Sequence, residues 1–152
     1  MLTLRTEIQI AATPERVWNI LMDFPAHGQW NPFVRSLEGT PRVGETLKVF
    51  IQPPGGRGMQ FRPKVLVVEV AREFRWKGKL LVTGLFDGEH FFILEQTPDG
   101  TVLFTQGEIF SGLLVPLMKK SLEGPTKNGF IAMNEALKRL AEAPRSFITQ
   151  QN

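Results

Sequence analysis

His90 and Glu108 are the two residues of this 152-residue chain with the clearest chemical potential. An imidazole and a carboxyl group can exchange a proton or bind the polar end of a ligand. If both side chains point inward, an ionised Glu108 needs a hydrogen-bond partner, and His90 is one. Gln106 is not expected to serve Glu108, because it lies two residues away on the same strand. A buried hydrogen bond without function, or a carboxylate at a wet cavity mouth, is the alternative.

Several other chemistries are excluded by composition. The chain has no Cys, no Tyr and two His residues, which excludes disulfides, thiol catalysis and Cys-based metal sites. We expect no metal and no cofactor, because the acidic residues show no ligand spacing. The segment 55–58 is interpreted as a turn, since it lacks the Gly-Lys-Ser/Thr ending of a phosphate loop. His27 follows a helix-ending proline and is expected to be exposed in a loop.

Length and hydropathy predict one domain over residues 1–152, with an ordered core over about 3–143. Residues 144–152 are polar and expected to fray. No apolar run reaches the ~18 residues that a membrane span needs, and the N-terminus lacks a signal-peptide pattern. A cytoplasmic location is therefore expected.

The net charge of +3 predicts no nucleic-acid partner. A basic stretch runs from Arg57 to Lys79, and within it Arg75, Lys77 and Lys79 alternate onto one strand face. This face is interpreted as a solvated outer surface, with weak contact to an anionic membrane surface as the alternative. The sequence does not predict an oligomeric state.

Hydrophobic periodicity predicts an α+β fold. Residues 3–10 alternate as a strand, and Thr13 caps a helix that begins at Pro14 and ends before Pro25. A short helix or turn is expected at 26–30. Six further strands are expected at 34–38, 46–52, 61–71, 73–81, 85–95 and 101–110. A long amphipathic helix at 113–143 must cover the apolar face of the antiparallel sheet, with a kink or break expected at Gly124-Pro125.

Four stretches in this order resemble the helix-grip superfamily often called SRPBCC. They are Ala-Thr-Pro-Glu-Arg-Val-Trp at 12–18, Trp-Asn-Pro-Phe at 30–33, residues 84–92 with Leu94-Glu95, and residues 104–112. The resemblance is to the bacterial polyketide cyclase/dehydrase and lipid-transport branch, which is related to START domains. It implies a curved, seven-stranded antiparallel sheet with two short N-terminal helices. It also implies a long C-terminal helix over an apolar cavity.

The candidate cavity residues are mostly aromatic or apolar side chains on faces that the resemblance directs inward. They are Trp30, Phe33, Phe50, Trp76, Phe86, His90, Phe92, Phe104, Gln106, Glu108, Phe110, Leu117, Met118, Phe130, Met133, Asn134 and Leu137. Burying about 200 Å² of apolar ligand is worth roughly 5 kcal/mol before ordering costs. The alternative is that the rings simply fill the core.

Three functions stay open. The first is binding or carrying a small hydrophobic, aromatic or lipid-like molecule. The second is an aromatase/cyclase-type enzyme acting on polyketide-like substrates, with His90 and Glu108 as acid and base. The third is an interaction protein such as a chaperone activator, whose sign would be an exposed apolar patch outside the cavity.

Overall fold

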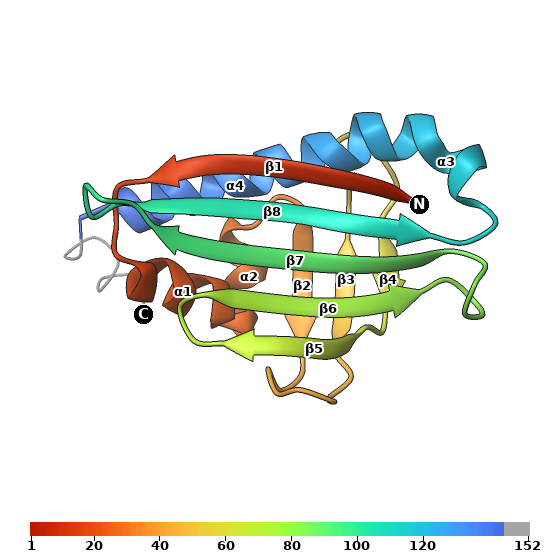
Figure 1. Ribbon diagram of the computed structural model, residues 1–152, viewed down its shortest axis with the longest axis horizontal. Helices are drawn as coiled ribbons and strands as arrows, with labels where there is room; N and C mark the ends of the chain where they lie inside the picture. Colours follow the sequence, from red (N-terminus) through yellow and green to blue (C-terminus); the bar gives the residue numbers. More distant parts are fainter. Residues whose placement is uncertain (145–152) are drawn as a thin grey trace.

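A five-stranded antiparallel sheet forms one layer of the protein, and the C-terminal helix lies across one of its faces (Figure 1). The structure, a computed structural model, describes residues 1–144, and residues 145–152, for which fraying was expected, lie outside this range. The strand order is β1-β8-β7-β6-β5. The strands are β1 (Leu2–Ile10), β5 (Lys64–Glu69), β6 (Glu73–Lys79), β7 (Asp87–Gln96) and β8 (Val102–Ser111).

A second sheet has three short strands that run across the first in Figure 1. They are β2 (Val34–Glu38), β3 (Lys48–Ile51) and β4 (Met59–Phe61), in the order β2-β3-β4. The expected single seven-stranded sheet is therefore wrong, because the segment 61–71 is not one strand. Pro63 has no N–H for a strand ladder, and at this residue the chain passes from β4 to β5 and changes sheet.

The helices are α1 (Pro14–Met22), the 3₁₀ turn η1 (Phe24–Ala26), α2 (His27–Trp30), α3 (Val115–Ser121), the π-helical turn η2 (Leu122–Thr126) and α4 (Lys127–Glu142). The predicted cap of α1 is confirmed, since Thr13 Oγ1 accepts a hydrogen bond from the Arg16 N–H at 3.2 Å. The backbone stays helical from Val115 to Glu142. No break occurs at Pro125, because it lies in η2, whose wider turn tolerates the missing N–H.

The expectation that His27 is exposed is wrong, because its ring is only 1% exposed. Nε2 donates to the Leu21 carbonyl at 2.7 Å, and Nδ1 accepts from Asn31 Nδ2 at 3.1 Å. Burial lowers the pKa of His27, which favours this neutral ring. Asn31 Oδ1 in turn accepts from the backbone N–H groups of Phe33 and Val34, both at 2.9 Å. The network fixes the start of β2 against the end of α1.

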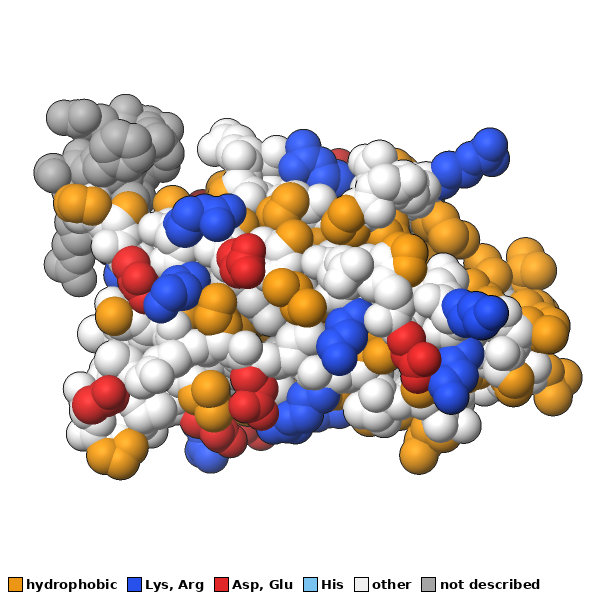
Figure 2. All heavy atoms as spheres, turned by 90° about the horizontal axis from the view of Figure 1, so that it is seen from above, with side chains coloured by type: hydrophobic (Ala, Val, Ile, Leu, Met, Phe, Trp, Pro, Cys, Tyr) orange, Lys and Arg blue, Asp and Glu red, His pale blue; other side chains and the backbone are white. Residues whose placement is uncertain are grey.

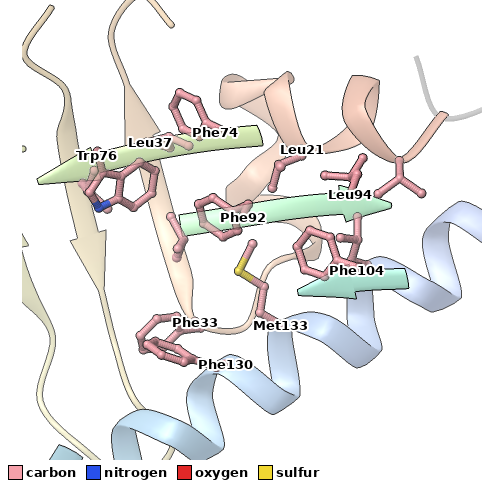
Figure 3. Close-up of a cluster of buried hydrophobic side chains, with 14 of the residues drawn as sticks. Leu21, Phe33, Leu37, Phe74, Trp76, Phe92, Leu94, Phe104, Phe130 and Met133 are labelled. Atoms are coloured by element: carbon pink, nitrogen blue, oxygen red, sulfur yellow. The ribbon is translucent and has the colours of Figure 1, made fainter. Parts of the chain in front are cut away.

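Large rings fill the space between the sheet and α4 (Figure 3). Phe92 of β7 lies between Phe74 and Phe104, with ring centroids 6.2 Å away on each side. Phe130 and Met133 of α4 close this core and are fully buried. The inner faces predicted for β7 and β8 are confirmed by these contacts.

Gly129 of α4 lies directly against Phe33, and a Cβ atom at this position would collide with the phenyl ring. Gly124 lies in the same continuous helix, but a Cβ atom there would meet no atom within 4 Å beyond its chain neighbours and its own helix. The two glycines therefore form a matched pair that separates close packing from helix propensity.

We expect Gly129→Ala to lower the free energy of unfolding by about 1–3 kcal/mol, because Phe33 or the helix must shift. Gly124→Ala should change it by less than about 1 kcal/mol, because the gain from lower unfolded-state entropy is opposed by the steric restriction on a helical residue before Pro125. Urea denaturation of both variants measures the difference. Equal effects of the two substitutions would contradict the close contact.

Candidate functional site

A cavity of about 480 Å³ lies beside the packed core, between the β3–β4 hairpin, strands β6 to β8, and the α3–η2 segment. Its size is within the range of small-molecule sites. Most of its wall is apolar. The lining residues are Phe33, Val49, Ile51, Pro53, Gly56, Arg57, Gly58, Met59, Phe61, Pro63, Trp76, Gly78, Lys79, Phe86, Gly88, Glu108, Phe110, Met118, Ser121, Leu122, Pro125 and Thr126.

Two glycines make this part of the sheet hollow. Gly78 of β6 pairs directly with Gly88 of β7, and both line the cavity. By strand alternation they occupy the inner-face positions next to Trp76 and His90. Because glycine has no side chain, the rings that fill the core elsewhere are missing here. Phe86 and Phe110, stacked with centroids 5.6 Å apart, form one wall.

Glu108 of β8 brings a carboxyl group to this apolar wall. Its side chain is 16% exposed, and Oε1 lies 3.1 Å from Nδ1 of His90 on β7. The carboxyl group extends over Gly88, where any Cβ atom would collide with Oε2. Gly88 therefore opens the cavity and also makes room for the Glu108 side chain.

His90 itself is fully buried and begins a chain of hydrogen bonds that reaches α4 and β1. Its Nε2 lies 2.9 Å from Gln106 Oε1, and Gln106 Nε2 donates to Asn134 Oδ1 at 2.7 Å. Asn134 Nδ2 donates to Thr6 Oγ1 at 2.8 Å, and this hydroxyl donates to the Gln106 carbonyl at 2.8 Å. The chain thus joins strands β1, β7 and β8 to the long helix.

The direction of this chain determines where the protons of His90 lie. Gln106 Nε2 also lies 3.4 Å from the Phe130 carbonyl, which can only accept a hydrogen bond. The amide oxygen of Gln106 therefore faces His90, and Nε2 of the ring carries a proton. The contact between Nδ1 and Glu108 is a hydrogen bond only if a second proton lies between them. An imidazolium with a carboxylate, or a neutral ring with a carboxylic acid, satisfies this condition.

The contact between Gln106 and His90 was not predicted from the sequence. Gln106 does not bond to Glu108, as expected, but it binds the other nitrogen of the same ring. The register explains this arrangement, since His90 pairs with Glu108 and its neighbour Phe92 pairs with Gln106. Glu108 and Gln106 lie on the same face of β8, so each contacts a different nitrogen of the His90 ring on β7.

The structure divides the predicted cavity residues into three groups. Those that line the cavity are Phe33, Trp76, Phe86, Glu108, Phe110 and Met118. Those buried in the adjoining core are His90, Phe92, Phe104, Gln106, Phe130, Met133, Asn134 and Leu137. Trp30 and Phe50 are half-buried outside the cavity lining, and Leu117 is exposed to solvent.

Half of the cavity residues that were not predicted from the sequence come from the β3–β4 hairpin. Val49 and Ile51 alternate on the inner face of β3, and the predicted turn at 55–58 closes over the cavity. Because one continuous strand was expected at 61–71, the sequence did not predict the β3–β4 hairpin that forms this wall. Lys79, predicted on the outer face with Arg75 and Lys77, also lines the cavity, as does Arg57.

Ligands for a metal ion do not come together in residues 1–144, where no three His, Cys, Asp or Glu side chains are grouped suitably. Within this range, no helix combines the length and apolar composition needed to cross a bilayer. The polar groups of the cavity wall are thus a carboxyl group, two cationic side chains and hydroxyl groups. They can hydrogen-bond an organic ligand.

A long helix held over an antiparallel sheet, with a cavity at one end of the interface, defines a helix-grip protein. Residues 1–143 match the family described as polyketide cyclase / dehydrase and lipid transport. The chain belongs to this family, and the resemblance drawn from the four sequence stretches is confirmed. No curated protein matches the chain.

Solved structures share the fold at low sequence identity. Protein MLL2253 from Mesorhizobium loti is 24% identical with a TM-score of 0.70, over 91% of this chain and 96% of that one. A START superfamily protein from Mycobacterium smegmatis is 20% identical with a TM-score of 0.70, over 92% and 97%. The Zhui aromatase/cyclase from Streptomyces sp. R1128 is 13% identical with a TM-score of 0.74, over 93% of each chain.

We expect Gln106→Leu to lower the free energy of unfolding by about 1–3 kcal/mol, because His90 Nε2 and Asn134 lose their buried partner. Thr105→Val is the matched control. The neighbouring Thr105 hydroxyl is equally buried and has no hydrogen-bond partner within residues 1–144. The control should change stability by less than about 1 kcal/mol or increase it. Equal destabilisation in urea titrations would contradict the proposed chain.

Proposed function

We propose that this protein binds a small hydrophobic or aromatic molecule in the cavity beside Gly78 and Gly88. The observation that carries the proposal is a hollow of about 480 Å³ with a mostly apolar wall and one carboxyl group. Small-molecule sites are typically concave, mostly apolar hollows of about 300–1,000 Å³. This hollow has that size and character.

The wall favours a flat or branched apolar body. Trp76, Phe86 and Phe110 offer ring faces and edges, and Met118 offers an adaptable thioether. Covering about 200 Å² of apolar ligand surface yields roughly 5 kcal/mol before ordering costs. Micromolar affinity is within reach without any special chemistry.

Glu108 supports a ligand that also carries a hydroxyl group, which can donate a hydrogen bond to it. Its Oε1 is engaged by His90, and Oε2 remains as the group that extends over Gly88 into the cavity wall. In either protonation state that makes this hydrogen bond, the shared proton lies between Nδ1 and Oε1, so Oε2 presents an acceptor to the ligand. Arg57 and Lys79, which also line the cavity, favour additional negative charge on the ligand.

We expect Met118→Trp to weaken binding of 1-anilinonaphthalene-8-sulfonate at least 10-fold, because the larger ring fills the cavity. Leu117→Trp is the matched control, since Leu117 is the adjacent helix residue and is exposed to solvent. Fluorescence titration measures both affinities, and thermal unfolding verifies that both variants fold. Equal affinities for the two folded variants would contradict binding in the cavity.

An aromatase/cyclase activity is the second candidate, favoured by the Glu108–His90 pair and by the likeness to the Zhui aromatase/cyclase. His90 does not line the cavity, so Glu108 alone would touch a substrate. His90 would act through Glu108 as a positioning residue. The cavity would bring the ends of a poly-keto chain together, so that ring closure is intramolecular.

We expect Glu108→Gln to reduce cyclisation of a poly-keto substrate at least ~100-fold if Glu108 transfers a proton. Glu89→Gln is the control, because Glu89 pairs with Arg75 away from the cavity. Product analysis by mass spectrometry measures the rates. Unchanged turnover in Glu108→Gln would remove Glu108 from the chemistry and leave binding as the function.

A further inference from the structure

Four exposed apolar side chains gather at one end of the molecule, outside the cavity. Leu81 and Val82 follow β6, Leu113 precedes α3, and Leu117 lies on α3, with exposed fractions of 79%, 62%, 80% and 83%. We call these four residues the apolar tip. Figure 1 places the two loops at the same end, and Figure 2 shows hydrophobic side chains gathered there with Lys and Arg side chains nearby.

Backbone hydrogen bonds join the two loops that form the apolar tip. Leu113 N–H donates to the Gly84 carbonyl at 3.1 Å, and Leu114 N–H donates to the Leu85 carbonyl at 3.0 Å. Gly112, with φ of 118°, permits this approach, since a Cβ atom there would lie 2.6 Å from the Leu85 oxygen. The backbones of the two loops that carry the exposed side chains are thus joined to each other.

Leu81 has a φ of 66°, a conformation that favours Gly or Asn over a bulky residue. Neither burial nor turn geometry explains a leucine at this position, because the side chain is exposed. An apolar partner in contact with the side chain would explain it.

Three lysines lie on the segments that carry the apolar tip. Lys79, Lys119 and Lys120 are exposed on the segments that carry it, and Lys119 lies 3.9 Å from its helix neighbour Glu123. The nearby Asp87 is buried and accepts a hydrogen bond from the Gly84 N–H. The tip therefore presents leucine and valine side chains beside exposed ammonium groups.

We propose that the apolar tip docks this protein on a bilayer that contains anionic lipids. Apolar side chains enter the boundary between headgroups and acyl chains, and lysines beside them attract anionic headgroups. A protein partner is a poorer fit, because a stable interface needs about 800 Å² per partner and four side chains on a protruding end offer less.

The docked orientation places the cavity close to the lipid. Lys79 and Met118 line the cavity, and their chain neighbours at the tip include Leu81 and Leu117. An apolar molecule could then move between bilayer and cavity with little exposure to water. The docking itself does not depend on what the cavity binds.

Co-sedimentation of the full chain with phosphatidylcholine vesicles containing about 30% phosphatidylglycerol tests the proposal. We expect binding that weakens at least 10-fold in Leu113→Gln/Leu117→Gln. The matched control is Val70→Gln, because Val70 is 74% exposed in the β5–β6 turn, away from the apolar tip. This variant should bind as the unmodified protein does. Binding should also weaken when the anionic lipid is omitted or when salt is raised.

The proposal is overturned if the unmodified protein does not sediment with anionic vesicles, or if the double variant binds them equally. It is also overturned if light scattering shows a dimer that only the double variant loses, because a second copy would then cover the apolar tip. Thermal unfolding of each variant separates a loss of docking from a loss of the fold. A cavity variant such as Met118→Trp should still bind vesicles, so failure of ligand binding and failure of docking are distinguishable.

Discussion

The distribution of large side chains and glycines along the inner face of the sheet determines where the protein is packed and where it is hollow. Where β6 and β7 carry Phe74, Trp76 and Phe92, large rings fill the inner face of the sheet, and Phe92 lies beside Met133 of the long helix. Where the same strands carry Gly78 and Gly88, nothing fills the space, and the cavity begins. One end of the interface therefore holds the helix in place, which lets the other end remain hollow at tolerable cost in stability.

The buried polar chain has a comparable double role. Asn134 ties the helix to Thr6 of β1 and Gln106 of β8, and Gln106 fixes the proton on Nε2 of His90. Buried polar groups are costly unless every partner is present, so the chain specifies one register of helix on sheet. The chain ends at Glu108, whose carboxyl group lines the cavity. The carboxyl group is held in position by His90, which does not line the cavity.

Much of the fold was predictable from the sequence, because it follows from local rules. Alternation indicated β1, and Thr13-Pro14 indicated the start of α1, whereas the inner faces of β7 and β8 were indicated by the family resemblance. The change of sheet at Pro63 was not predictable in the same way, because the pairing partner of a strand is set by distant residues.

For the candidate site, the sequence indicated Glu108 and several rings. The cavity, however, exists because Gly78 and Gly88 have no side chains and because the β3–β4 hairpin folds over this part of the sheet. Hydrophobic periodicity does not predict where a hairpin folds. The burial of His27 likewise depends on groups that no local pattern brings together.

The most direct test of this account uses the methionine methyl groups as reporters of where a guest molecule lies. Met59 and Met118 line the cavity, whereas Met133 is fully buried in the adjoining core. With ¹³C-labelled methyl groups, titration with an apolar aromatic molecule such as naphthol should shift the Met59 and Met118 signals and leave Met133 nearly unchanged. A large shift at Met133 with none at Met59 and Met118 would place the guest under α4 and contradict the hollow beside Gly78 and Gly88.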